Sequence, residues 1–123
     1  EGKQPFKYVT NKISLENAAS DVKVMFDIHL PNGTDFDVYV KLNKTGDASA
    51  DDKVNWIKFD NYQKQNTGNK SDNYMSYDLM LSKHCSEWND NIEFISLRVK
   101  LIGRSSNSSS PVLFKNLRII AVT

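Results

Sequence analysis

Few side chains in this sequence could perform covalent chemistry. The chain has one cysteine, Cys85, and two histidines, His29 and His84. A cysteine next to a histidine has the residue types of a nucleophile and its base. Neighbouring residues of an extended chain point to opposite sides, however, so we do not expect these two side chains to meet. The sequence contains no Gly-rich phosphate loop, nucleophile elbow or zinc-protease helix motif, and we predict no enzymatic activity and no cofactor.

Metal ligation is a second possible chemistry. Asp47, Asp51 and Asp52 crowd one polar segment, and calcium favours hard oxygen ligands of this kind. Their spacing lacks the order of ligands in helix-loop-helix calcium sites, and aspartates are also common in solvated turns. One cysteine and two distant histidines do not readily form a structural zinc site. We therefore predict no metal site.

Aromatic side chains beside polar groups give a third possibility, which is the binding of a ligand or partner. Trp88 lies in the polar stretch SEWNDN at 86–91, and Tyr62 and Tyr39 are further candidates for exposed rings. Sugar sites use such rings next to hydrogen-bonding side chains. Together with Arg98, these three residues form our candidate ligand or docking surface. The competing interpretation, which we favour for the tryptophans, is that Trp88 and Trp56 close the ends of the fold.

Composition limits the class of protein. The chain has 123 residues, of which 39% are hydrophobic and 25% charged, and this balance predicts a single globular domain over residues 1–123. The net charge of +1 argues against a dedicated nucleic-acid or anionic-membrane binder. No apolar run approaches the length of a membrane span, and a lone cysteine cannot form an internal disulfide.

Short apolar segments separated by Asn, Asp, Ser and Gly must position these side chains. In 22–30 and 36–44 apolar and polar residues alternate, which is typical of strands with one buried face. This alternation places Asp27 and His29 on a solvent-facing side. The Asn-Gly pair at 32–33 predicts a hairpin between the two strands. Five further segments have strand character, at 6–15, 56–59, 73–81, 94–102 and 112–122, and a single helical turn is expected within 82–90.

Seven or eight short antiparallel strands joined by polar turns predict an all-β fold, specifically an antiparallel β-sandwich. The strand pattern leaves two connectivities open, jelly-roll-like and immunoglobulin-like. The last strand alternates poorly, because Ile119 to Val122 are consecutive apolar residues. Such a strand is covered on both faces or ends against another subunit.

Several of these strands resemble a module found in structural proteins of T4-like and marine tailed phages. The resemblance lies in YVTNKISLE at 8–16, DVKV at 21–24 and GTDFDVYVKL at 33–42, followed by LRVKL at 97–101 and KNLRIIA at 115–121. In that family the module closes large baseplate or tail proteins and carries no catalytic residues. The middle of the chain, between Asn43 and His84, does not match.

The resemblance implies a virion protein that is assembled in the host cytoplasm and whose partners are other tail or baseplate subunits. The start at EGK is expected for a C-terminal fragment of a longer chain. We expect this virion structural domain to act by protein–protein docking, without nucleic acid or membrane as partner. The apolar last strand and the outward strand faces are the expected docking surfaces, and those faces carry Asp27, His29, Tyr39, Lys41, Arg98 and Lys100. Two alternatives remain: a carbohydrate-binding, lectin-like module that recognises a surface glycan, and an adhesion domain.

Overall fold

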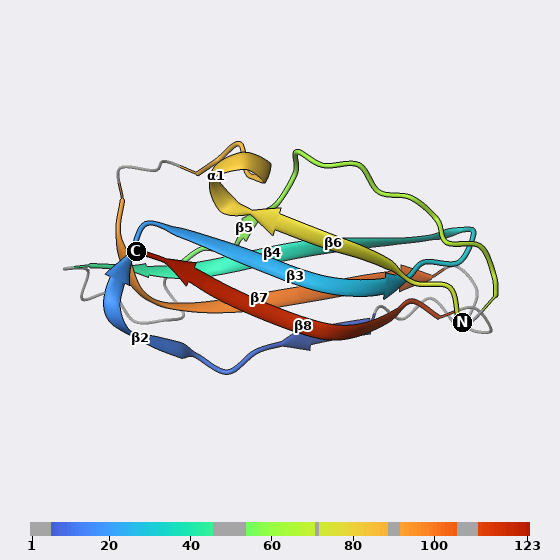
Figure 1. The fold of residues 1–123 in the computed structure, drawn as a ribbon, viewed down its shortest axis with the longest axis horizontal. Coiled ribbons are helices and arrows are strands. Elements are labelled where there is room, and N and C mark those ends of the chain that lie inside the picture. Colours follow the sequence, from blue (N-terminus) through green and yellow to red (C-terminus); the bar gives the residue numbers. More distant parts are fainter. Residues whose placement is uncertain (1–5, 46–53, 71, 89–91, 106–110) are drawn as a thin grey trace.

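Two antiparallel sheets pack face to face in the computed structural model, which describes residues 6–45, 54–70, 72–88, 92–105 and 111–123 (Figure 1). The predicted all-β antiparallel sandwich is confirmed, with eight strands in the described residues. The larger sheet contains β1 (Phe6–Val9), β2 (Ile13–Ala19), β4 (Thr34–Lys44), β5 (Ile57–Lys58) and β7 (Phe94–Ser105). The smaller sheet contains β3 (Asp21–His29), β6 (Met75–Met80) and β8 (Leu113–Val122), and one helical turn, α1 (Leu81–His84), follows β6.

The strand order explains which surfaces are exposed. The larger sheet runs β1-β7-β4-β5, with β2 also paired to β7, and the smaller sheet runs β6-β3-β8. The first and last strands of the chain therefore lie at the edges of different sheets. In Figure 1 β8 runs beside β1 and β2 along the lower side of the molecule. Five strands face only three, so the two sheets do not cover each other completely.

The core forms where the alternating segments face each other. Val22, Val24, Phe26 and Ile28 of β3 are fully buried, as are the inward residues of β4. This confirms the inward faces predicted for 22–30 and 36–44. The predicted hairpin between these two segments is wrong, because β3 pairs with β6 and β8 of the smaller sheet whereas β4 pairs with β5 and β7 of the larger one. The turn between them crosses from one sheet to the other, and Gly33 in this turn has a φ of 81°, which glycine adopts without a steric penalty.

The segment 6–15, predicted as one strand, is two strands that both pair with β7. Thr10 lies at the break between them. Its backbone N–H donates to the carbonyl of Val99 over 2.9 Å, and its hydroxyl accepts from the N–H of Val99 over 3.0 Å. The Thr10 side chain thus replaces a backbone acceptor where the strand is interrupted.

His29 corrects the prediction of a solvent-facing side chain. It lies on the outer face of β3, but only 3% of it is exposed, because Thr67, Asn73 and Tyr74 lie against it. Its Nδ1 is 2.9 Å from the carbonyl oxygen of Asn73 and 3.2 Å from the hydroxyl of Thr67. Strand alternation predicts the face on which a residue lies, but not what covers that face.

Gly103 gives a first test of this packing. A Cβ atom at Gly103 would lie 2.8 Å from Cβ and 2.9 Å from Cγ1 of Val112. We expect Gly103→Ala to lower the free energy of unfolding by about 1–3 kcal/mol, because overpacking a tight core forces its neighbours to shift. Urea unfolding measures the change. Val112→Ala, combined with Gly103→Ala, should recover part of the loss, and a neutral Gly103→Ala would contradict the close contact.

Candidate functional site

The outer face of the larger sheet collects most of the charged and aromatic candidates. Side chains of β4 and β7 alternate between the core and the outer face, and the register places Tyr39 opposite Lys100 and Lys41 opposite Arg98. Lys41, expected on an outward docking surface, lies on this face but is only 7% exposed. Tyr39 also lies opposite Lys58 of β5, and Trp56 directly precedes β5. Three strands therefore bring cations and aromatic rings onto one face.

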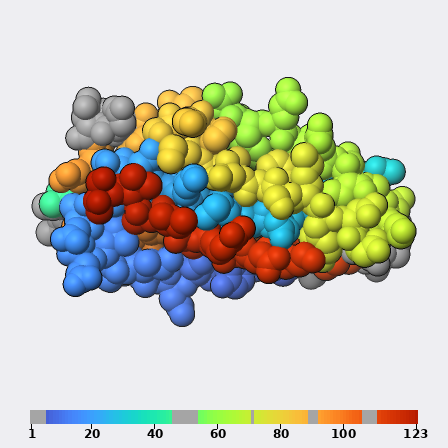
Figure 2. Space-filling model, in the orientation of Figure 1, coloured from blue at the N-terminus to red at the C-terminus, as the bar shows by residue number. Residues whose placement is uncertain are grey.

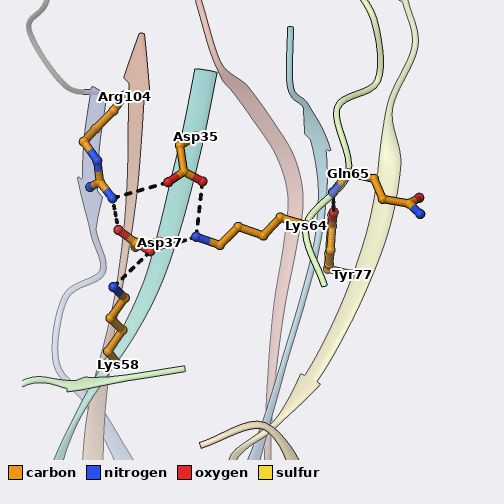
Figure 3. Close-up of polar contacts among 7 residues, drawn as sticks. All are labelled: Asp35, Asp37, Lys58, Lys64, Gln65, Tyr77 and Arg104. Carbon is orange, nitrogen blue, oxygen red and sulfur yellow. Dashed lines mark hydrogen bonds and ion pairs between the residues drawn. The ribbon is translucent and has the colours of Figure 1, made fainter. Parts of the chain in front are cut away.

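A buried carboxylate occupies one end of this face. Asp37 is only 2% exposed, although it lies on the outer side of β4. Arg104 donates a hydrogen bond to its carboxylate, Lys64 Nζ is 3.0 Å from it, and Lys58 Nζ is 3.4 Å from it (Figure 3). Asp35 adds a second carboxylate to the same cations. The ion pairs themselves cover Asp37, which strand alternation places on the solvent side.

Burial raises the pKa of the Asp37 carboxyl, but hydrogen bonds from Arg104 and Lys64 outweigh burial and hold this pKa below its usual value. Asp37 is therefore ionised at neutral pH, and its carboxylate is bound by Lys58, Lys64 and Arg104. Such a group serves as a structural anchor and not as a general acid or base.

Next to this anchor, on the same face, lies a group that we call the cation–aromatic cluster: Tyr39, Lys41, Trp56 and Lys100. Lys100 Nζ is 4.6 Å from the centroid of Tyr39 and 4.4 Å from that of Trp56, and Lys41 Nζ is 5.0 Å from Trp56. Ammonium groups are attracted to aromatic faces at these distances. We had expected Trp56 to close an end of the sandwich. It lies instead on the outer face of the larger sheet, against Lys41 and Lys100.

The four predicted site residues do not form one surface. Tyr39 and Arg98 lie on the outer face of the larger sheet, where the Nε–H of Arg98 donates to the carbonyl of Thr10 over 3.1 Å. Trp88 instead packs edge-on against Phe94 at 6.0 Å. Tyr62 contacts the rings of Phe36 and Tyr77.

Both Trp88 and Tyr62 are half-buried against the core, so neither offers the flat exposed ring that a sugar platform requires. The indole Nε1 of Trp88 and the hydroxyl of Tyr62 are buried without a hydrogen-bond partner among the described residues. Burial raises the pKa of the Tyr62 hydroxyl, and the negative charge of Asp37 raises it further.

A second surface, which we call the seam, lies where the edges of the two sheets meet. Phe6 and Tyr8 pair with Gly103 and Leu101, so they face the inside of the sandwich. Each is nevertheless 47% exposed, because the smaller sheet does not extend over β1. Phe6 stacks on Phe114 of β8 at 5.7 Å. Figure 2 shows β8, in red, beside the blue N-terminal strands.

A groove of about 180 Å³ opens in the seam. Its lining is mostly apolar and consists of Phe6, Tyr8, Leu101, Phe114, Lys115, Asn116 and Leu117. The alternation in 6–15 marks Phe6 and Tyr8 as core anchors, and nothing in that pattern shows that the opposite layer is missing. Sequence reasoning therefore missed the seam, apart from the apolar character of the last strand.

The remaining candidates do not converge. The His84 Nδ1 accepts from the N–H of Met80 over 2.8 Å, whereas the Cys85 thiol donates to the carbonyl of Lys58 over 3.4 Å. Burial raises the pKa of that thiol. Asp47, Asp51 and Asp52 lie outside the described residues. Within the described ranges, no three His, Cys, Asp or Glu side chains gather as metal ligands, and no helix is long and apolar enough to cross a membrane.

No protein-family model matches the chain, and neither the curated proteins nor the solved structures include a significant match. The structure defines an all-β, sandwich-like domain with two surfaces that could bind a partner or ligand: the seam and the cation–aromatic cluster.

The role of Asp37 as an anchor is testable by substitution. We expect Asp37→Asn to lower the free energy of unfolding by about 2–4 kcal/mol at pH 7, because it removes the buried carboxylate that three cations share and leaves only Lys64 and Arg104 with a carboxylate, that of Asp35. Asp78→Asn is the matched control, since the exposed Asp78–Lys23 pair, 3.5 Å long, should contribute about 0.5 kcal/mol or less.

The same substitution should change the response to acid. A carboxyl whose folded-state pKa is depressed stabilises the fold above its unfolded pKa of about 3.9, and this stabilisation is lost as the pH falls through the folded-state pKa. Asp37→Asn should therefore lose less stability than the wild type between neutral pH and the acid range, as measured by urea unfolding at each pH. Identical pH profiles for the two proteins would contradict this role.

Proposed function

We propose that the chain is a docking domain of a tailed-phage tail or baseplate protein, and that it binds neighbouring virion subunits through the seam. The observation that carries this proposal is the exposure of Phe6 and Tyr8, two aromatic side chains that face inward and yet are uncovered. The strand signatures shared with tailed-phage structural modules support the virion setting. Burial of about half of each ring would favour association through the hydrophobic effect.

The seam fits an extended segment of a partner. Among the described strands β8 pairs only with β3, and β1 pairs only with β7, so each has one unpaired edge. An unpaired edge offers backbone N–H and C=O groups to an added strand, while apolar pockets select its side chains. We therefore propose that the partner contributes a β-strand whose apolar side chains enter the groove between Tyr8 and Leu117.

A carbohydrate-binding module is the second candidate function. The observation that favours it is the cation–aromatic cluster, because Tyr39 and Trp56 are aromatic rings on a sheet face outside the core. Trp88 and Tyr62, the rings first considered for this role, pack against the core instead. A glycan site would therefore lie on the outer face of the larger sheet, away from the seam.

Photo-crosslinking in assembled particles tests the docking proposal. The photoreactive residue p-benzoylphenylalanine replaces Tyr8, which it resembles in shape, and is placed at the exposed Lys83 of α1 as the control. We expect position 8 to crosslink to a second structural protein of the same particle, and position 83 to give much less product. Purified particles that lack the chain, or equal crosslinking from both positions, would refute docking through the seam.

A further inference from the structure

At the seam the smaller sheet stops at β8, whereas the larger sheet continues to β1. Among the described strands the smaller sheet consists of β6, β3 and β8, and β8 lies at its edge. In Figure 1 β8 runs beside β1, and Phe6 of β1 stacks on Phe114 of β8. Phe6 and Tyr8 face the inside of the sandwich and are exposed, so the layer that would cover them is a further neighbour of β8.

An added strand can cover these rings from only one of the two unpaired edges. Hydrogen-bonded strands lie side by side about 4.8 Å apart, whereas facing sheets lie about 10 Å apart. A strand on the edge of β1 would extend the larger sheet and leave Phe6 and Tyr8 open to solvent. A strand on the edge of β8 would extend the smaller sheet, and its inward side chains would enter the groove beside Leu101 and Leu117.

The outer face of β8 presents two cations next to this edge. Lys115 lies opposite Asp27 and Arg118 lies opposite Met25, although the two cations are an odd number of positions apart in the chain. A one-residue bulge at Asn116, which has a φ of 58°, restores the alternation between them. Both cations are exposed, and both therefore lie on the outer face of the smaller sheet at its open edge.

Asp27 is the carboxylate that the register places beside these cations. Both of its oxygens already accept hydrogen bonds, from the hydroxyl of Ser76 over 2.6 Å and from the side-chain amide of Asn116 over 2.8 Å. No salt bridge joins Lys115 or Arg118 to a carboxylate within the described ranges. A single carboxylate balances one of the two positive charges at most, so this edge keeps a net positive charge.

β8 also carries two features that hinder indiscriminate strand pairing. Natural edge strands avoid pairing with one another by means of bulges and lysines, and here Asn116 directly follows Lys115. A second copy of the chain placed antiparallel on β8 would bring Lys115 and Arg118 close to their own equivalents, and like charges across a strand pair are unfavourable. Acidic side chains in the same places would be attracted, so the edge selects its partner by charge.

We propose that the partner at the seam is an extended segment that pairs with the free edge of β8 and becomes a fourth strand of the smaller sheet. Apolar and acidic side chains alternate along this segment. The apolar ones enter the groove over Phe6 and Tyr8, and the acidic ones lie on the outer face beside Lys115 and Arg118. This inference rests on the proposed docking through the seam and specifies the chemistry of the partner there.

Fluorescence anisotropy tests the proposal with a short labelled peptide in which valine and glutamate alternate, into which the 123-residue chain is titrated. The comparison peptide has glutamine in place of glutamate. We expect the glutamate peptide to bind about fivefold more tightly, because it gains opposite-charge pairs across the added strand. A double variant, Lys115→Gln with Arg118→Gln, should bind both peptides equally, whereas Lys83→Gln on the exposed surface of α1 should keep the preference.

Amide hydrogen exchange of the same complex shows which edge receives the peptide. At a peptide concentration about ten times the Kd, we expect amides of 114–119 that face the free edge to exchange about tenfold more slowly. Amides of β1 should show a much smaller effect, because the peptide covers their side chains and does not pair with their backbone. Circular dichroism confirms that each variant is folded, since Lys115 also lies over the ring of Tyr74, 3.9 Å from its centroid.

Three results would overturn this inference. Equal affinity of the unaltered chain for the two peptides, or binding of neither, would show that acidic alternation is not recognised. Slower exchange confined to β1 would place the added strand on the larger sheet. Dimerisation of the free chain, with the same β8 amides protected, would show that a second copy occupies this edge. Crosslinking from position 8 in particles depends on none of these results, so docking through the seam can hold where strand pairing at β8 fails.

Discussion

The buried Asp37 carboxylate constrains much of this fold. A carboxylate that is almost removed from water is costly unless it is paired, and its partners come from three separate parts of the chain: Lys58 of β5, Arg104 of β7 and Lys64. Next to Lys64, the N–H of Gln65 donates to the hydroxyl of Tyr77 in β6 over 3.0 Å (Figure 3). Asp37 on β4 thereby helps to hold β5, which lies at the edge of the larger sheet. It also helps to hold residues 64–65, which contact β6 of the smaller sheet.

The unequal size of the two sheets accounts for both proposed surfaces. Because five strands face three, β1 lacks a covering layer and leaves Phe6 and Tyr8 exposed in the seam. On the opposite side of the larger sheet nothing in the smaller sheet can cover Tyr39 and Lys100, which are instead partly covered by one another and by Trp56. A partner at the seam and a ligand on the outer face could therefore bind at the same time.

Sequence reasoning succeeded where alternation alone decides the outcome. The strands around Phe26 and Val38, their inward faces and the turn at Gly33 follow from local pattern and turn chemistry. The pattern did not show that this turn joins two sheets and does not close a hairpin, because pairing partners are set by distant strands. It failed where a distant segment covers a strand face. His29 looks exposed in sequence because alternation places it on the outer face of β3, yet it lies beneath Thr67 and Asn73.

The sequence by itself determined the fold class, because a period of two in apolar residues permits only strands with one buried face. It also determined which residues share a strand face, including Tyr39 with Lys41 and Arg98 with Lys100. Only the tertiary structure decided which faces meet, which edge stays open and which charges pair. These outcomes depend on contacts between residues far apart in the chain, such as Asp37 with Arg104 and Phe6 with Phe114, and local periodicity carries no information about such contacts.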